Sequence, residues 1–260
     1  ESEAIVRRYD ASFVEAETVG SVLLSYTLLA KHFDLEEVLV CDTNLRDGVL
    51  HEMAGGSPWT EDFQKQIIRS SISLARRFGA DEDHAQNVAE LARELFHQLA
   101  PVHQLGTKFE VFLYAAAMLF EIGLSINTRS NHKHAFYLIR NSDIFGLSER
   151  EALLVALVVR YHRRATPQAS HEAFAGLPQS DRVAVSKMAA LLRMAIALDD
   201  TRSGRIRRLR CSTTQSSCEI EALGVDDVSL EQVAMRSAAL LFRDVFGMQV
   251  ALRGGGAVDG

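Results

Sequence analysis

The sequence is poor in cysteine, proline and tryptophan, since its 260 residues include only three cysteines, four prolines and one tryptophan. Three cysteines are too few for a disulfide framework, and their spacing provides no tight thiol pair for a metal. A low cysteine count is usual in the reducing cytoplasm, and few prolines favour helix. The longest apolar run, residues 111–120, is far shorter than the ~20 residues that a membrane-spanning helix needs. We therefore expect a helical, cytoplasmic protein with no membrane partner.

Neither sign of charge is in large excess. The chain has 28 lysines and arginines against 34 aspartates and glutamates, which gives a net charge of −6. This acidic balance argues against a general nucleic-acid-binding surface, although local basic clusters can still bind phosphate groups. Glycine-rich nucleotide loops, the GxSxG nucleophile motif and the HExxH metal motif are absent from the sequence. We therefore expect no nucleic-acid partner and assign no catalytic residue.

The first 55 residues are predicted to be the end of an α/β domain. Apolar residues recur at helical spacing over residues 19–30, and residues 37–41 form a short apolar, β-branched run typical of a buried strand. Thr43 follows as a predicted helix N-cap. Because one strand cannot satisfy its own backbone, we expect residues 1–55 to be the tail of a larger domain. The alternative is that this strand pairs with the C-terminal region.

Residues 56–200 are predicted to form a helical domain. After a linker over residues 55–58, apolar residues recur at helical spacing in segments 60–78, 81–99, 108–121, 148–159 and 181–198. Ser148 and Glu151 have the spacing of a capping box. Residues 152–159 are apolar on every side, which is typical of a helix at the centre of a bundle.

Residues 201–260 are predicted to form a small α+β subdomain. A looser apolar alternation over residues 206–222 indicates strands, and a helix at 229–246 and a short apolar segment at 248–252 follow. The glycines at 254–256 are expected to fray. The predicted fold class is therefore mainly α, with a helical bundle between the tail of an α/β domain and this subdomain.

Histidines and a carboxylate reach the inner side of successive predicted helices at His84, Glu121, His132, His134 and His162. The arrangement is similar to metal-dependent phosphohydrolases of the HD type, in which a histidine, a His-Asp pair and a late aspartate converge on the metal. Here the pair reads Phe120 and Glu121, and Ile196 stands at the late position, so two ligands are replaced by carbon side chains. The sequence predicts a vestigial site with no metal, in which His84 can also be read as a hydrogen-bonded core histidine.

Basic side chains gather in three places. His132, Lys133 and His134 open a short predicted helix, whose free N–H groups favour an anion, although a solvated turn is the alternative. Arg163 and Arg164 follow the long apolar helix, where the helix dipole by itself accounts for cations. The third place holds five arginines between residues 202 and 210, which are interpreted as a solvated strand edge.

Four segments, taken together and in order, resemble the exopolyphosphatase/guanosine pentaphosphate phosphohydrolase family (Ppx/GppA). Residues 40–50 (VCDTNLRDGVL) are similar to its strand followed by L-R-(E/D)-G and an apolar residue. Residues 132–139 (HKHAFYLI) are similar to its H-K/R-H-S-x-Y-L/I-I segment, and residues 158–164 (VVRYHRR) resemble its V-R-Y-H-R-K segment. Residues 241–247 (LFRDVFG) are similar to the end of its C-terminal helix.

The resemblance implies an actin-like two-lobed domain that hydrolyses terminal phosphoanhydrides with Mg²⁺, then an HD-like helical domain and a small terminal subdomain. The phosphate-binding glycine loops and the catalytic carboxylate of that family precede the segments found here. The resemblance therefore implies that residues 1–55 are the remnant of the actin-like domain, and that no catalytic loop or cofactor belongs to this chain. The polyphosphate contacts that it implies are His132, Lys133, His134, His162, Arg163, Arg164 and, as a lesser candidate, Arg46.

The leading hypothesis is the C-terminal part of a polyphosphate or guanosine pentaphosphate phosphohydrolase, which by itself positions the phosphate chain and is inactive. Its expected partners are that substrate, the protein's own actin-like domain and a second copy in a homodimer. A free-standing HD-type metal phosphohydrolase and a non-enzymatic dimerising scaffold are the alternatives. The sequence leaves the choice between polyphosphate and guanosine pentaphosphate open.

Overall fold

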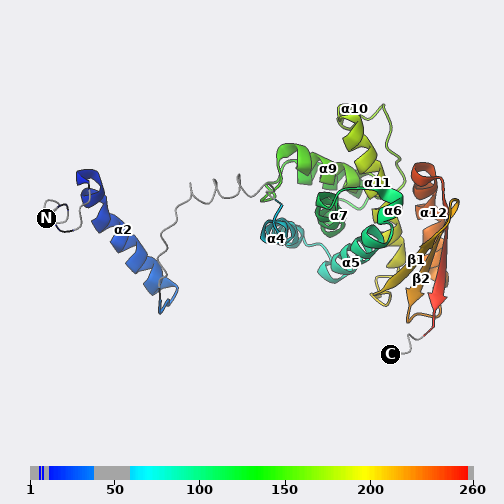
Figure 1. Cartoon of the computed structure of the whole chain (residues 1–260), viewed down its shortest axis with the longest axis horizontal. Coiled ribbons are helices and arrows are strands. Elements are labelled where there is room, and N and C mark those ends of the chain that lie inside the picture. Colours follow the sequence, from blue (N-terminus) through cyan, green and yellow to red (C-terminus); the bar gives the residue numbers. More distant parts are fainter. Residues whose placement is uncertain (1–5, 7, 9–11, 38–58, 257–260) are drawn as a thin grey trace. The chain divides into compact units, whose positions relative to one another are not determined.

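The computed structural model describes residues 6, 8, 12–37 and 59–256 (Figure 1). The chain divides into two units, residues 1–58 and residues 59–260, and each is described by itself. Most of the strand predicted at 37–41 and all of the helix predicted after Thr43 lie outside the described residues. The linker at 55–58 and Arg46 also lie outside them.

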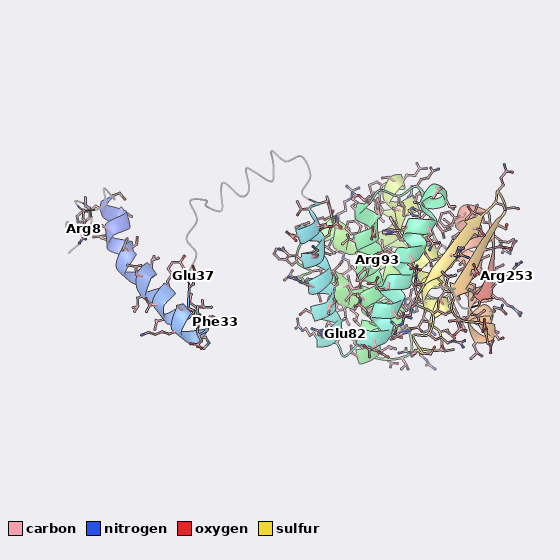
Figure 2. All side chains as sticks on the ribbon, turned by 60° about the horizontal axis from the view of Figure 1, so that its bottom comes forward. Arg8, Phe33, Glu37, Glu82, Arg93 and Arg253 are labelled. Atoms are coloured by element: carbon pink, nitrogen blue, oxygen red, sulfur yellow. The ribbon has the colours of Figure 1, made fainter. Side chains whose placement is uncertain are left out.

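The first unit contains the helix α2 (Phe13–His32), which confirms the helix predicted over residues 19–30. Its side chains project on all sides (Figure 2), and large apolar ones such as Leu23 and Leu24 are each 60% exposed. Within the helix, Ser25 donates its hydroxyl hydrogen bond to the carbonyl of Ser21 at 2.9 Å. No described helix, α2 included, is long and apolar enough to cross a membrane.

The helical part of the second unit follows the predicted segments closely. Its elements are α4 (Glu61–Arg77), α5 (Glu82–Gln98), α6 (Ala100–His103), α7 (Lys108–Leu119), the 3₁₀ helix η1 (Ile122–Ser125), α8 (Asn131–Arg140), α9 (Glu149–Arg160), α10 (Glu172–Ala175) and α11 (Gln179–Leu198). Helix α7 packs against α4, α5, α9 and α11, and its residues 111–119 are all buried. In α9, residues 154–159 are buried, as the apolar run predicted. The bundle core is therefore built around α7 and α9.

Side-chain caps explain where several of these helices begin. Thr60 accepts a hydrogen bond from the backbone N–H of Phe63 at the start of α4, and Asp81 accepts one from His84 at the start of α5. The capping box predicted from Ser148 and Glu151 is present at the start of α9, with both reciprocal hydrogen bonds. Each cap satisfies N–H groups that have no partner within the helix.

The C-terminal part consists of β1 (Leu209–Thr213), β2 (Ser217–Leu223), α12 (Ser229–Phe246) and β3 (Gln249–Gly255). The strands form one sheet in the order β1-β2-β3, in which β1 and β2 are antiparallel and β2 and β3 are parallel. Helix α12 connects the parallel pair and packs against β3 and α11 (Figure 1). The mainly α fold with a small α+β part is thus confirmed, and one hydrophobic core runs through both parts.

The outer edge of β1 is bonded to helix α5. The backbone N–H of Leu209 donates to Glu94 at 2.6 Å, and that of Cys211 donates to Gln98 at 2.7 Å. The Gln98 amide donates in return to the Leu209 carbonyl at 2.8 Å. These bonds satisfy an exposed strand edge and join the sheet to the helical bundle.

The expectation that the C-terminal glycines fray is wrong for two of them. Gly254 and Gly255 belong to β3 and pair with β2. A Cβ at Gly254 would lie 2.1 Å from the backbone oxygen of Asp226, so no other residue fits there without a shift. The glycines permit a close backbone approach.

Candidate functional site

Three side-chain rings, which come from three segments of the chain, lie close together in the core of the second unit. Phe120, the C-cap of α7, has its ring centroid 5.7 Å from that of His84 in α5 and 5.4 Å from that of His162, which follows α9. All three residues are buried. Three residues of the predicted vestigial site are therefore brought together, with the Phe120 ring against both histidines.

A buried carboxylate completes this cluster. Asp199, the C-cap of α11, lies 2.9 Å from Nδ1 of His84, and both side chains are almost fully buried. Its other oxygen accepts the backbone N–H of Gly204 at 2.8 Å. Burial raises the pKa of Asp199, but hydrogen bonds from His84, Asn87 and Gly204 outweigh it and bring that pKa below its ordinary value.

Ile196, predicted to stand at the late position, lies close in the chain to the carboxylate that meets His84. Asp199, which lies three residues after Ile196, pairs with His84. Helix α11 ends at Leu198, so Asp199 follows Ile196 by about one turn at the helix end. Phe120 places a carbon ring in the cluster, and Ile196 lines a neighbouring pocket.

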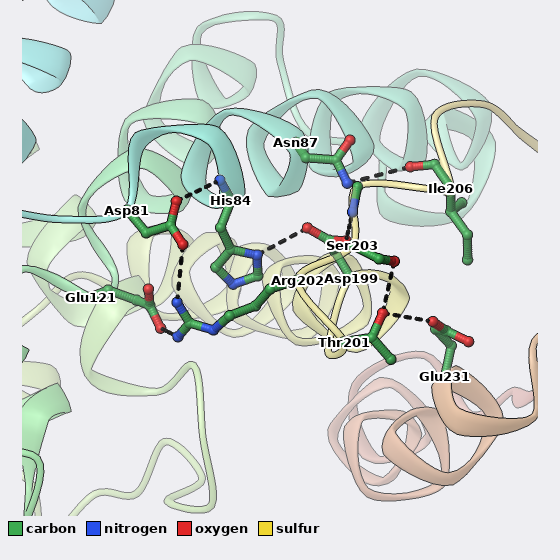
Figure 3. A network of polar contacts seen from close by, with 11 residues as sticks. Asp81, His84, Asn87, Glu121, Asp199, Thr201, Arg202, Ser203, Ile206 and Glu231 are labelled. Atoms are coloured by element: carbon green, nitrogen blue, oxygen red, sulfur yellow. Dashed lines mark hydrogen bonds and ion pairs between the residues drawn. The ribbon is translucent and has the colours of Figure 1, made fainter.

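Beside this cluster, one arginine bridges two carboxylates (Figure 3). The Arg202 guanidinium contacts Glu121, just after α7, and Asp81, the N-cap of α5, with 3.4 Å between Nη1 and the Asp81 carboxylate. The Glu121 side chain is 9% exposed, whereas those of Arg202 and Asp81 are nearly half exposed.

These residues do not fit a metal ion. Within the described ranges, no group of three or more histidine, cysteine, aspartate or glutamate side chains is arranged to hold one. The Phe120 ring supplies no lone pair, and His84 is already paired with Asp199. The Arg202 guanidinium brings a positive charge to Glu121, which would repel a cation there.

A pocket of about 690 Å³ opens next to the cluster, and we name it the arginine pocket. Arginines on the loops after α9 and α11, together with Arg193 of α11, supply its basic side chains: Arg163, Arg164, Arg193 and Arg202. Apolar residues of α12, such as Leu230 and Val233, line it as well. Glu121 and Asp200 are the acidic residues of its lining.

Arg193 holds the loop that carries the pocket's basic residues. Its guanidinium donates to the backbone carbonyl of Tyr161 at 2.7 Å and to that of Ala165 at 2.6 Å. Burial lowers the pKa of Arg193 to about 10, so it still carries its charge at neutral pH. The loop between these two carbonyls includes Arg163 and Arg164, both exposed.

His162 adds no charge to the arginine pocket at neutral pH. Burial lowers its pKa to about 3, and the positive charges of Arg163 and Arg193 act in the same direction. Its Nδ1 lies 2.6 Å from the Val159 carbonyl, which is an acceptor, so Nδ1 carries the proton of the neutral ring. His162 therefore contributes shape and a hydrogen-bond acceptor, and the charge comes from the arginines.

The basic segment at the start of α8 lies partly beside this pocket. Asn131, its first residue, lines the pocket and accepts a hydrogen bond from Arg163 at 3.4 Å. The His132 ring lies 6.5 Å from that of His162, and burial lowers the pKa of His132. Lys133 is exposed, and neither it nor His134 lines the pocket.

A glycine brings α8 to the pocket. A Cβ at Gly123, in η1, would lie 2.1 Å from the backbone oxygen of Asn131, so only glycine allows η1 and the first turn of α8 to lie this close. Glu121 just before η1 and Asn131 in α8 consequently line the same pocket.

Sequence reasoning missed Arg193, Asp199 and Arg202. The acidic pair at residues 199–200, directly after a predicted helix, was an available signal for the carboxylate. Arg202 was grouped with a solvated strand edge, although it precedes β1 and contacts Glu121. Arg205 of the same run pairs with the fully buried Glu231 at 2.5 Å.

The fold defines the class of protein as a helical domain closed by a small α+β part, with a basic pocket between them. The family model described as Ppx/GppA phosphatase, domain III, matches residues 68–242, more than half of the chain. The chain therefore belongs to the Ppx/GppA phosphatase family. The match covers the aromatic and histidine cluster and all the basic residues of the arginine pocket.

Proposed function

We propose that this chain is the C-terminal part of a phosphohydrolase for polyphosphate or guanosine pentaphosphate, and that the arginine pocket binds the phosphate chain of that substrate. One observation carries the proposal: Arg163 and Arg164 lie side by side at the pocket without a carboxylate partner. No ion pair involves either of them within the described part of the chain. Guanidinium groups bind phosphate oxygens through two parallel hydrogen bonds, which makes arginine suited to this ligand.

The charge around the pocket supports an anionic ligand. Of its two acidic residues, Glu121 is already paired with Arg202. Arg193 is committed to backbone carbonyls but keeps its charge. The net charge of the lining is therefore positive, although the whole chain carries −6. Such a local basic site attracts a polyanion that the rest of the surface repels.

Hydrolysis is proposed to belong to the rest of the protein. Residues 1–55 are proposed as the tail of the actin-like domain, which would use Mg²⁺ and would pack against its own C-terminal part. The exposed apolar side chains of α2 support this proposal, because a helix apolar on all sides is normally buried. Arg46 would then be a lesser contact for phosphate.

The test measures binding of long-chain polyphosphate to the purified chain by calorimetry at several salt concentrations. The double variant Arg163→Ala/Arg164→Ala should bind about 10- to 100-fold more weakly and with a flatter salt dependence, because charge-assisted phosphate contacts are lost. The matched control is Arg207→Ala/Arg208→Ala, which removes an adjacent, exposed arginine pair outside the arginine pocket.

Two outcomes contradict the proposal. Equal losses in both double variants would mean that binding follows net charge and not the pocket. No binding by the unaltered chain at low salt would leave the domain with a structural role. Phosphate release from polyphosphate with Mg²⁺ is a separate assay, in which sustained turnover by this chain would refute its proposed inactivity.

A further inference from the structure

The start of α5, the end of α7 and the end of α11 bring carboxylates toward one another. Asp81 caps α5, Glu121 follows α7, and Asp199 caps α11. In a metal-dependent site of this geometry the ion would neutralise such groups. Here Asp199 already accepts hydrogen bonds from His84 and Gly204, so Glu121 and Asp81 are the two carboxylates that lack a side-chain partner within this cluster.

Arg202 pairs with both of these carboxylates through two different nitrogens. Its Nη2 donates to Glu121 and its Nη1 to Asp81, so one planar group joins two segments that are 40 residues apart (Figure 3). The Glu121 carboxylate is buried, and a buried charge needs a partner of opposite sign. The forked guanidinium suits this bridging role, in which a lysine ammonium would act as a single point charge.

The backbone is bent to bring Arg202 back to these carboxylates. Arg202 has a φ of 54°, in the left-handed region that non-glycine residues rarely adopt. The turn is closed by a hydrogen bond from the Arg202 N–H to the Asp199 carbonyl at 2.9 Å. Thr201 also donates to the buried Glu231 of α12 at 3.1 Å (Figure 3). A strained residue held by its neighbours indicates that the position of its side chain matters.

We infer that the Arg202 guanidinium is the resident cation of the site that the sequence predicts to be a vestigial metal site, and that it takes the place of a metal ion there. Phe120 closes the remaining ligand position, since its ring packs against both His84 and His162. The helical domain thus keeps its carboxylates in place without a metal. This inference does not depend on the ligand of the arginine pocket.

The test compares thermal unfolding of three chains with and without Mn²⁺. Arg202→Ala should unfold roughly 5–10 °C lower than the unaltered chain, because Glu121 loses its partner. Added Mn²⁺ should raise the midpoint of Arg202→Ala, since the freed carboxylates of Glu121 and Asp81 can then bind a divalent cation. Arg207→Ala removes a nearby arginine that contacts neither carboxylate, so it should show neither effect.

A second variant keeps the inference testable if Arg202→Ala does not fold. Glu121→Gln/Arg202→Ala needs no counter-charge for Glu121, so it should fold, be more stable than Arg202→Ala and show no Mn²⁺ response. The inference is overturned if Arg202→Ala unfolds at the unaltered midpoint, or if Mn²⁺ leaves its lowered midpoint unchanged. It is also overturned if Mn²⁺ shifts the unaltered chain equally, or if the double variant regains no stability.

Discussion

Helices α2 and α7 are both apolar on nearly every side, yet they differ in burial. In α7, residues 111–119 are all buried, and Leu113 is fully covered by neighbouring helices. In α2, Leu23 and Leu24 are each 60% exposed. The apolar composition of a helix therefore indicates that it needs to be buried, but it does not indicate which segment packs against it. Helix α7 is buried by other helices of its own unit, whereas the described residues of the first unit do not bury α2.

The largest expected effect is found by making a leucine-to-alanine substitution in each of the two helices and comparing the results. Leu113→Ala should lower the free energy of unfolding of the second unit by about 2–5 kcal/mol, because it leaves a cavity in the core. Leu23→Ala should change the same free energy of unfolding by less than about 0.5 kcal/mol. Urea unfolding followed by the fluorescence of Trp59, which packs against Phe63 and Phe112, measures both. A comparable loss in both variants would show that α2 is packed in solution.

A smaller effect concerns protonation of the buried His162. His162 has a folded-state pKa of about 3 against an ordinary value of 6.5, so between these pH values the unfolded chain binds more protons. The free energy of unfolding should therefore fall as pH decreases from 6.5, by roughly 1 kcal/mol per pH unit from this group.

Substituting His162 and, as a control, His32 tests this cause. His162→Gln should make the dependence on pH less steep without removing it, because burial also lowers the pKa of His103 and of His132. His32→Gln, at the end of α2 in the first unit, is the control for the unfolding of the second unit. Urea unfolding at pH 7 and pH 5 measures this. Identical slopes for the two variants would contradict the burial of His162 as its cause.

The smallest effect comes from serine-to-alanine changes in the two units. Ser148→Ala removes the capping box of α9 and should cost about 1 kcal/mol in the urea unfolding of the second unit. Ser25→Ala, in the interior of α2, removes only a bond to the preceding turn and should leave circular-dichroism helicity equal or slightly higher. A loss of helicity in Ser25→Ala would contradict the expectation that the hydrogen bond from Ser25 to Ser21 adds no stability to α2.

Local signals explain why much of the fold could be predicted. The predicted helices at 60–78 and 81–99 match α4 and α5 within two residues, and the capping box at Ser148 marks the start of α9. A 3.6-residue repeat and a cap each depend on residues within one or two turns. The end of β3 escaped prediction because Gly254 is required by its approach to Asp226, a contact that no local pattern records.

The candidate site was predictable only in part. His162, Arg163 and Arg164 were recognised from their resemblance to a family segment, and they line the arginine pocket. Arg193 lies within an apolar helical pattern that gave no sign of its role, and Arg202 was interpreted as part of a solvated strand edge. Both gain their roles from contacts with residues more than 25 positions away.

The sequence by itself determined the helix positions, their caps and the presence of an aromatic side chain at residue 120. Tertiary structure decided that Asp199 meets His84, that Arg202 joins Glu121 to Asp81, and that the arginines share one pocket. The physical reason is the range of the interactions. Backbone hydrogen bonding and side-chain periodicity act over a few residues, whereas charges pair according to how helices distant in the chain pack together.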